Sequence, residues 1–179
     1  MKKVFIDGSA GTTGLRIYER LADRKDIELM ILTGDERKDD AARAKALHSA
    51  DIAFLCLPDA AAKEAVAMAE GSDVVIIDTS TAHRTSEGWA YGFPELTGHR
   101  ENIKTAKRIA NPGCHASGFI SLVRPLVEKG IIKEDAALTC FSLTGYSGGG
   151  KSMIAQYEGT DRGESQPDFL DSPRLYGLT

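Results

Sequence analysis

The sequence has little of what marks exported, membrane or nucleic-acid-binding proteins. It contains only three cysteines, an odd number that disfavours a disulfide framework. The opening residues, "MKKVFIDG", hold too short an apolar run for a signal peptide, and no segment approaches the length of a membrane span. The net charge of -4 and pI of about 5.6 are not those of a nucleic-acid-binding domain. We therefore expect a cytoplasmic, globular protein that binds neither nucleic acid nor membranes.

The first half of the chain is an alternation of short apolar runs with helical patterns. Strands are expected at residues 4–6, 27–32, 52–57 and 74–77, and helices at 15–22, 40–48 and 59–70. The first of these helices carries an apolar face made by Leu15, Tyr18, Leu21 and Ala22. Strands that alternate with helices predict right-handed βαβ units. The fold class is therefore α/β, with a doubly wound, Rossmann-type parallel sheet.

The alternation stops after residue 80. Residues 81–108 are polar and glycine-containing, and they are expected to form a long irregular connection. A second unit should follow, with a helix after residue 114 that Pro125 kinks or ends early, an apolar strand at 136–143, and loop from residue 145 onward. We expect a dinucleotide-binding domain at 1–110, and at 111–179 the beginning of a second, α+β catalytic domain.

A glycine-rich stretch, "GSAGTTG", follows the first strand and opens the first helix. Gly8, Gly11 and Gly14 allow a tight turn, and they let a pyrophosphate approach backbone N–H groups at the positive end of the helix. The spacing is G-x-x-G-x-x-G rather than G-x-G-x-x-G, so its position in a βαβ unit carries more weight than the pattern. The alternative is a turn that only packs tightly. We favour dinucleotide binding.

The charged run after the second strand bears on which dinucleotide is bound. NAD sites carry an acid at this place, whereas NADP sites carry cations for the 2′-phosphate. The run "TGDERKDD" offers Asp35 as well as Arg37 and Lys38, and an arginine can grip a phosphate with two hydrogen bonds. The run could instead be a solvated, charged surface segment. We favour NADP(H) as the cofactor.

Cys114 stands in "ANPGCHASG", directly after a Pro-Gly pair and at the start of a helical pattern. A helix N-terminus favours the thiolate form of cysteine, and neighbouring backbone amides can hold a developing oxyanion. The alternative is a cysteine that simply fits a tight turn. Cys56 and Cys140 lie in apolar runs that are expected to be strands, so both should be buried and inert.

Two further features are less specific. The run "GYSGGGKS" matches the phosphate-loop pattern literally, but no apolar strand ending in aspartate follows it, so a glycine-rich substrate loop is favoured over a nucleotide-triphosphate site. The four histidines show no spacing typical of metal ligands, and no metal is expected. His83 and Arg84 follow "DTST" at the end of the fourth strand, where open α/β sheets bind ligands.

Taken together, "GSAGTTG", "RKDDAAR", "FLCLPD", "DTSTAHR", "YGFPEL", "NPGCHASG" and "GYSGGGKS" resemble N-acetyl-γ-glutamyl-phosphate reductase in its shorter form, from arginine biosynthesis. The pieces "YGFPEL" and "NPGC", at this distance from a glycine fingerprint, are the specific ones. Aspartate-semialdehyde dehydrogenase shares the architecture and a cysteine nucleophile, so it is the nearest relative to exclude. The motifs would also suit a dinucleotide-binding fragment that holds NADP(H) without turnover and, more remotely, a phosphate-loop NTPase.

The resemblance implies a small acyl-phosphate substrate, NADPH as reductant, a semialdehyde product and a homo-oligomer. It implies that Cys114 attacks the acyl carbon and expels phosphate, leaving a thioester for reduction. The family's histidine acid/base comes from a segment beyond "RLYGLT", so it is expected beyond Thr179. The cofactor residues so implied are Gly8, Gly11, Thr12, Thr13, Gly14, Arg37, Lys38, Pro58, Ser80 and Thr81, and the substrate residues are Arg84, Asn111, Ser147 and Gly148.

Overall fold

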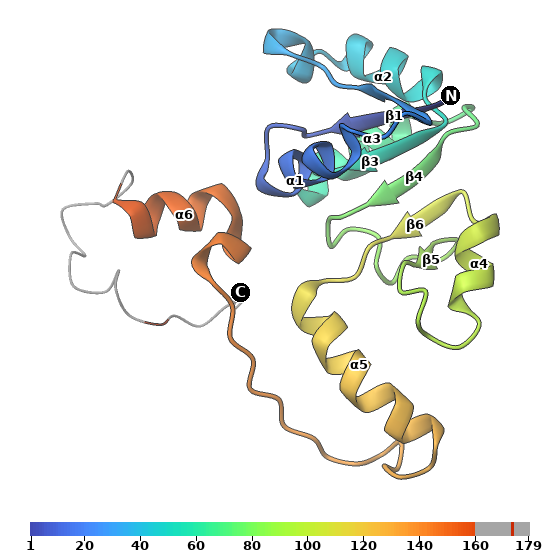
Figure 1. Cartoon of the computed structure of the whole chain (residues 1–179), viewed down its shortest axis with the longest axis vertical. Coiled ribbons are helices and arrows are strands. Elements are labelled where there is room, and N and C mark those ends of the chain that lie inside the picture. Colours follow the sequence, from blue (N-terminus) through green and yellow to red (C-terminus); the bar gives the residue numbers. More distant parts are fainter. Residues whose placement is uncertain (160–172, 174–179) are drawn as a thin grey trace. The chain divides into compact units, whose positions relative to one another are not determined.

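The computed structural model describes residues 1–159 and 173, and the chain divides into two compact units, Met1–Cys140 and Phe141–Thr179. The first unit holds a sheet with its helices (Figure 1). The described part of the second unit contains the 3-10 turn η2 (Tyr146–Gly149) and the helix α6 (Gly150–Glu158). Among the described residues, no helix is long and apolar enough to cross a membrane.

The first unit is built on one six-stranded sheet with the strand order β2-β1-β3-β4-β6-β5. Every neighbouring pair of strands runs parallel. The direction of winding reverses after β2, because β3 returns to the other side of β1, which confirms the doubly wound parallel sheet. The strands are β1 (Lys2–Asp7), β2 (Ile27–Met30), β3 (Ile52–Leu55), β4 (Val75–Asp78), β5 (Ala90–Tyr91) and β6 (Arg108–Ala110).

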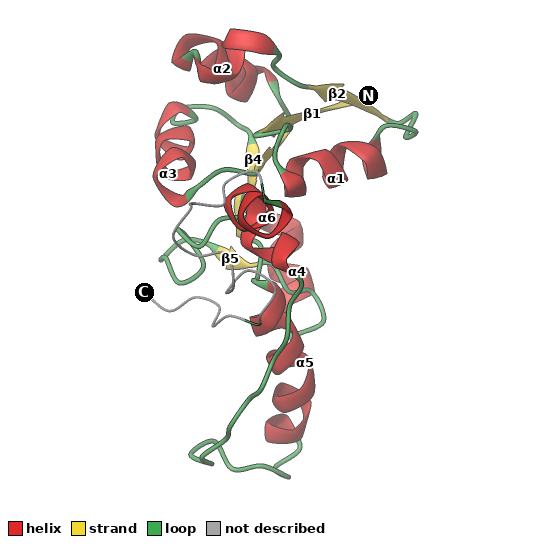
Figure 2. Cartoon of the chain, turned by 90° about the vertical axis from the view of Figure 1, so that its left-hand side faces the viewer, coloured by secondary structure: helices red, strands yellow, loops and turns green. Residues whose placement is uncertain are grey.

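Helices cover both faces of this sheet, as right-handed crossovers require. Figure 2 shows α2 and α3 on one face, and α1 and α4 on the other. The long helix α5 follows β6 and ends the regular structure of the unit. The helices are α1 (Thr12–Leu21), α2 (Asp40–Ser49), α3 (Asp59–Met68), α4 (His99–Thr105) and α5 (Cys114–Glu128), with the 3-10 helix η1 (Gly34–Lys38) before α2.

The hydrophobic core lies on the α2 and α3 face of the sheet. Phe5, Leu55 and Ile76 from three neighbouring strands are completely buried there against Leu47 of α2. Both helices contribute mainly alanines to this core, and small side chains let a helix lie close to a sheet. The opposite face is less well covered, because the apolar residues Leu15 and Tyr18 of α1, expected to face a core, remain 50% and 38% exposed.

The region 81–108 is not the irregular connection that its composition indicates. It contains β5, α4 and the start of β6. These elements left no readable pattern, because strands of two and three residues are too short to alternate and α4 is polar apart from Ile103. β5 and β6 extend the sheet by two strands, and β6 carries the chain to the edge where Cys114 lies.

The expected strand at residues 136–143 is wrong, because these residues, all of them described, form no strand and are exposed. An apolar run becomes a strand only beside another strand, and this run pairs with none in the described chain. The expectation of loop from residue 145 is also wrong, since η2 and α6 occupy residues 146–158.

Pro125 does not end its helix early, because α5 continues to Glu128. A proline removes one hydrogen bond to the carbonyl four residues earlier, here that of Ser121. Ser121 is exposed, so water can satisfy the carbonyl that the proline leaves without a donor. The position of the proline in the last turn limits the damage to the end of the helix.

Candidate functional site

The glycine-rich stretch forms a turn between β1 and α1 that only glycine can occupy at two places. Gly8 has φ +83°, and a Cβ at this residue would lie 2.2 Å from the carbonyl oxygen of Cys56, just beyond the neighbouring strand β3. A Cβ on Gly14 would lie 2.4 Å from the carbonyl oxygen of Gly8. The glycine turn is therefore packed tightly between the end of β3 and the first residues of α1. A ligand can approach its backbone from the side that faces away from both.

The N-terminus of α1 is a ready anion site. Gly11 is the N-cap residue and supplies no side chain to the first turn, which also lacks an acid. The backbone N–H groups of Thr12 and Thr13 are the free donors that a helix presents at its start, and the helix dipole adds positive potential there. A pyrophosphate fits this end of α1, since neither an acid of the first turn nor a capping side chain competes with it.

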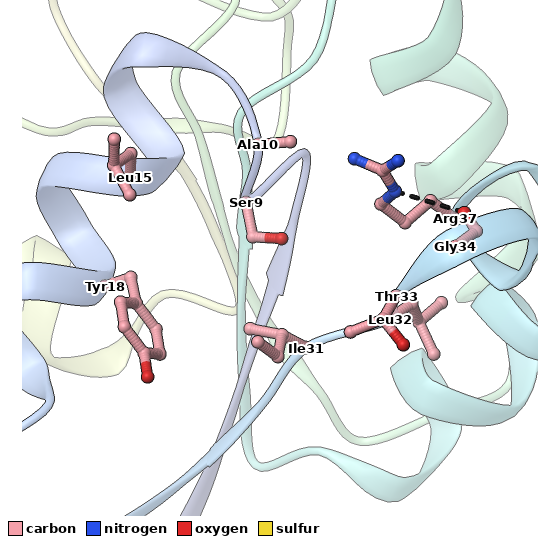
Figure 3. Close-up of a pocket in the computed structure, with 9 residues that line it drawn as sticks. All are labelled: Ser9, Ala10, Leu15, Tyr18, Ile31, Leu32, Thr33, Gly34 and Arg37. Carbon is pink, nitrogen blue, oxygen red and sulfur yellow. Dashed lines mark hydrogen bonds between the residues drawn. The ribbon is translucent and has the colours of Figure 1, made fainter.

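A pocket of about 410 Å³ continues from the glycine turn toward the end of β2 (Figure 3). Arg37 of η1 lines it, with Nε donating to the carbonyl of Gly34 at 3.2 Å while the other two guanidinium nitrogens extend toward Ala10. Lys38, expected to act with Arg37, is not a lining residue. The lining residues are Ser9, Ala10, Leu15, Tyr18, Ile31, Leu32, Thr33, Gly34 and Arg37.

The ends of β3 and β4 are tied together beside the glycine turn. Pro58 caps α3, and Asp59 follows as its first residue. The Asp59 carboxylate accepts hydrogen bonds from the backbone N–H of Thr81, at 2.9 Å, and from the Thr81 hydroxyl. These bonds hold the pKa of the Asp59 carboxyl below its usual value. Thr81 therefore lies at the expected edge, but its hydroxyl is engaged by Asp59.

Cys114 is the first residue of α5 and is exposed. The turn that precedes it continues the parallel ladder, because the N–H of Asn111 donates to the carbonyl of Asp78 at 2.8 Å. Arg84 crosses from the end of β4 to this turn, and its Nε donates to the carbonyl of Asn111 at 3.1 Å. Sequence position alone gave no sign that these residues meet.

The other two cysteines differ from each other. Cys56 lies just beyond β3 and is half-buried, so the expectation of a buried strand residue is only partly right. Burial raises the pKa of its thiol to about 11, which agrees with the expectation of an inert residue. Cys140 is exposed and lies in no strand, so the expectation that it is buried is wrong. The error follows from the missing strand at 136–143, because burial of that run depended on a sheet around it.

The phosphate-loop match is not supported by its surroundings. Such a loop connects a strand to a helix, and the residues before Gly145 form no strand, although α6 does begin within the motif. Ser147 and Gly148 lie in η2 of the second unit, and their contact with substrate stays a prediction. Among the described residues no cluster of three potential metal ligands is present.

Sequence reasoning missed a buried ion pair beneath the glycine turn. Asp7, the last residue of β1, accepts hydrogen bonds from Nε and Nη2 of Arg43 at 3.2 and 3.1 Å. Burial raises the pKa of the Asp7 carboxyl, and the positive charge of Arg43 opposes this rise. The only signal was an acid that ends an apolar strand directly before Gly8, whereas Arg43 looked like an ordinary helix-surface residue.

Both halves of the chain match known protein families. Residues 3–106 match the semialdehyde dehydrogenase NAD-binding domain, and residues 114–169 match the semialdehyde dehydrogenase dimerisation domain. Aspartate-semialdehyde dehydrogenases from Francisella tularensis and Vibrio cholerae share the fold, with TM-scores of 0.65 and 0.64 over 93% and 89% of this chain and about half of theirs (52% and 51%). Their sequence identities of 17% and 18% show likeness of fold alone.

Relatives of much higher identity bear a different name. N-acetyl-gamma-glutamyl-phosphate reductase of Chelativorans sp. is 53% identical over 178 residues, which is 99% of this chain and 56% of that protein. The protein of the same name from Rhizobium meliloti is 50% identical over 180 residues, 99% of this chain and 57% of that protein. The resemblance drawn from the motifs is thereby confirmed. The chain spans about half the length of the curated relatives it matches.

Proposed function

Because the chain belongs to the semialdehyde dehydrogenase family, we propose that the protein reduces N-acetyl-γ-glutamyl phosphate to the semialdehyde with NADPH, as a step of arginine biosynthesis. One observation carries the proposal for this chain's own residues. The glycine turn leaves β1 and Cys114 follows β6 at the same edge of one parallel sheet, the edge where α/β sheets bind ligands. Cofactor and nucleophile thus belong to one compact unit.

The glycine turn and the adjoining pocket suit a dinucleotide. The uncapped start of α1 offers N–H donors to the pyrophosphate, through Thr12, Thr13 and Gly14. Arg37 extends two guanidinium nitrogens into the pocket beside the turn, where a 2′-phosphate would be recognised in preference to a hydroxyl. These features support NADP(H). We assign supporting roles to Lys38, Pro58, Ser80 and Thr81.

Cys114 is assigned the nucleophile's role. Its thiolate attacks the γ-acyl carbon of the acyl phosphate, the C–O bond to phosphate breaks, and inorganic phosphate leaves with a thioester on the cysteine. The first N–H groups of α5 are donors that can hold the oxyanion formed during attack. Nη1 of Arg84 has no carbonyl acceptor among the described residues, so it can meet the substrate's phosphate. A bound NADPH would supply the hydride; once the thioester carbon has taken it up, breakage of the C–S bond would release the semialdehyde and free Cys114.

The remaining assignments rest on the same resemblance. We assign Asn111, Ser147 and Gly148 to the substrate. The separate family matches to residues 3–106 and 114–169 support a domain boundary between residues 110 and 111, although the chain up to Cys140 packs as one compact unit. The match to a dimerisation domain supports an oligomer, which we propose to be a homo-oligomer in the cytoplasm. An aspartate-semialdehyde-dehydrogenase-like activity is less favoured, because the relatives at about 50% identity carry the reductase name.

Two assays on the 1–179 chain and on a full-length relative test this proposal. NADPH fluorescence titration should show binding to both, and ATP should bind to neither. NADPH oxidation with N-acetyl-γ-glutamyl phosphate should be at least ~10²-fold slower in the 1–179 chain, because the family's acid/base is expected beyond Thr179 and positioned acid/base catalysis typically contributes about 10²–10⁴-fold. Absence of NADPH binding by both proteins would refute the cofactor assignment. Equal turnover would show that the downstream histidine is dispensable.

A further inference from the structure

A buried polar network at the end of β4 includes Asp78 and His83, which have no part in the reaction as proposed. Asp78 is completely buried, and its Oδ2 accepts hydrogen bonds from the Ser80 hydroxyl and from Nδ1 of His83, both at 2.7 Å. The N–H of Ser80 donates to the other carboxylate oxygen at 3.0 Å. The three donors hold the buried carboxylate in place, because the loss of any donor would leave a buried charge without one of its hydrogen bonds, at a cost in stability.

His83 is held from a second side as well. Its ring stacks on that of Trp89, with centroids 4.1 Å apart and planes 9° from parallel, and the residue is only 8% exposed. A hydrogen bond on one edge and a stacked ring on one face leave the imidazole a single orientation. The backbone that carries His83 is therefore fixed, and so is the residue that follows it, Arg84.

Arg84 links this fixed backbone to the turn before Cys114. Its Nε donates to the carbonyl of Asn111 at 3.1 Å and its Nη2 to the carbonyl of Thr79 at 3.2 Å, so the guanidinium links the ends of β6 and β4. Nη1 lies against Gly113, where a Cβ would be 2.9 Å away. Gly113 is the N-cap of α5 and directly precedes the cysteine.

We propose that His83 is a positioning residue, which holds Arg84 against the Asn111–Gly113 turn and thereby sets the place and the reactivity of Cys114. The proposal rests on the function proposed above, in which Cys114 is the nucleophile. It assigns no contact of His83 with substrate or cofactor. A network that served only to stabilise the fold would leave the reactivity of the folded protein's Cys114 unchanged.

The test measures the rate of iodoacetamide alkylation of Cys114 in the 1–179 chain, in a Cys140→Ser background that removes the other exposed thiol. His83→Ala and Arg84→Ala should each slow alkylation about 3- to 10-fold, because the turn that presents the Cys114 thiol at the start of α5 loses its anchor. If His83 acts through Arg84, His83→Ala should have no further effect in the Arg84→Ala background. His83→Asn retains a donor for Asp78 and should recover at least about half of the rate.

Two further variants keep the test decisive if His83→Ala does not fold. Gly113→Ala should displace the Arg84 guanidinium from the other side and slow alkylation by a similar factor. His48→Ala, on the exposed side of α2, should leave the rate unchanged and is the matched control. Unchanged alkylation in Arg84→Ala and Gly113→Ala, or additive effects of the two alanine changes, would overturn the proposal. NADPH titration of the parent chain is a separate measurement. NADPH binding with unchanged alkylation would refute the role of His83 alone, whereas absence of NADPH binding would refute the cofactor site.

Discussion

Replacing Gly8 by alanine should damage both the stability of the first unit and its cofactor site. Gly8 has φ +83°, in the left-handed region, where an L-residue with a side chain costs about 1–2 kcal/mol. The new Cβ would also stand 2.2 Å from the carbonyl oxygen of Cys56, closer than any real contact of such atoms. Relieving that overlap requires the turn and β3 to move apart. Overpacking of this kind costs about 1–3 kcal/mol.

The two costs together predict a loss of about 2–5 kcal/mol in the free energy of unfolding. Gly71→Ala is the matched control, since Gly71 has φ +76° but no atom within 4 Å of its added Cβ. That variant should lose about 1 kcal/mol, the backbone strain less the entropy that alanine removes from the unfolded chain. The difference between the two variants in the free energy of unfolding isolates the cost of the contact with Cys56.

Urea unfolding of the 1–179 chain followed by circular dichroism gives the two free energies, and NADPH fluorescence titration gives the affinity. Gly8→Ala should weaken NADPH binding strongly, because the displaced turn no longer presents its N–H groups at the start of α1. Gly71→Ala should bind as the parent does. Equal free energies of unfolding for the two variants, within about 0.5 kcal/mol, would refute the close packing of the turn against β3.

Arg37→Ala should weaken NADPH binding by about 1.5–3 kcal/mol and leave NADH binding nearly unchanged. Lys38→Ala should weaken NADPH binding much less, because only Arg37 of the two lines the pocket. Titration of both variants with both cofactors decides this. Peptide mapping after iodoacetamide at pH 8 should show labelling of the two exposed cysteines but not of Cys56, whose thiol pKa of about 11 leaves about one thiolate in a thousand. Arg43→Ala should lower the free energy of unfolding by about 3–5 kcal/mol, since it leaves the buried carboxylate of Asp7 without its partner. In urea titrations, Asp7→Asn in the Arg43→Ala background should recover part of that loss.

Much of the fold was readable because local pattern and tertiary environment agree in the first 80 residues. The four long strands are apolar runs, and the helices α2 and α3 begin and end close to where the pattern places them. The stripe of Leu15 and Tyr18 on α1 was real, but its exposure was not readable, since exposure depends on what else packs there. The same limit explains the strand expected at 136–143, which had the composition of a strand without a neighbour to pair with.

The sequence by itself determined the chemistry that this protein can offer: glycines after a first strand, an arginine after the second, and a cysteine where a helix begins. These depend on residue type and on local order, which the chain carries directly. Only the tertiary structure decided which of them meet. β5 and β6 bring the cysteine's turn to the edge that holds the glycine turn, and Asp78, His83 and Arg84 connect the ends of β4 and β6. Contacts between residues distant in sequence are set by strand order and close packing, and no local pattern records them.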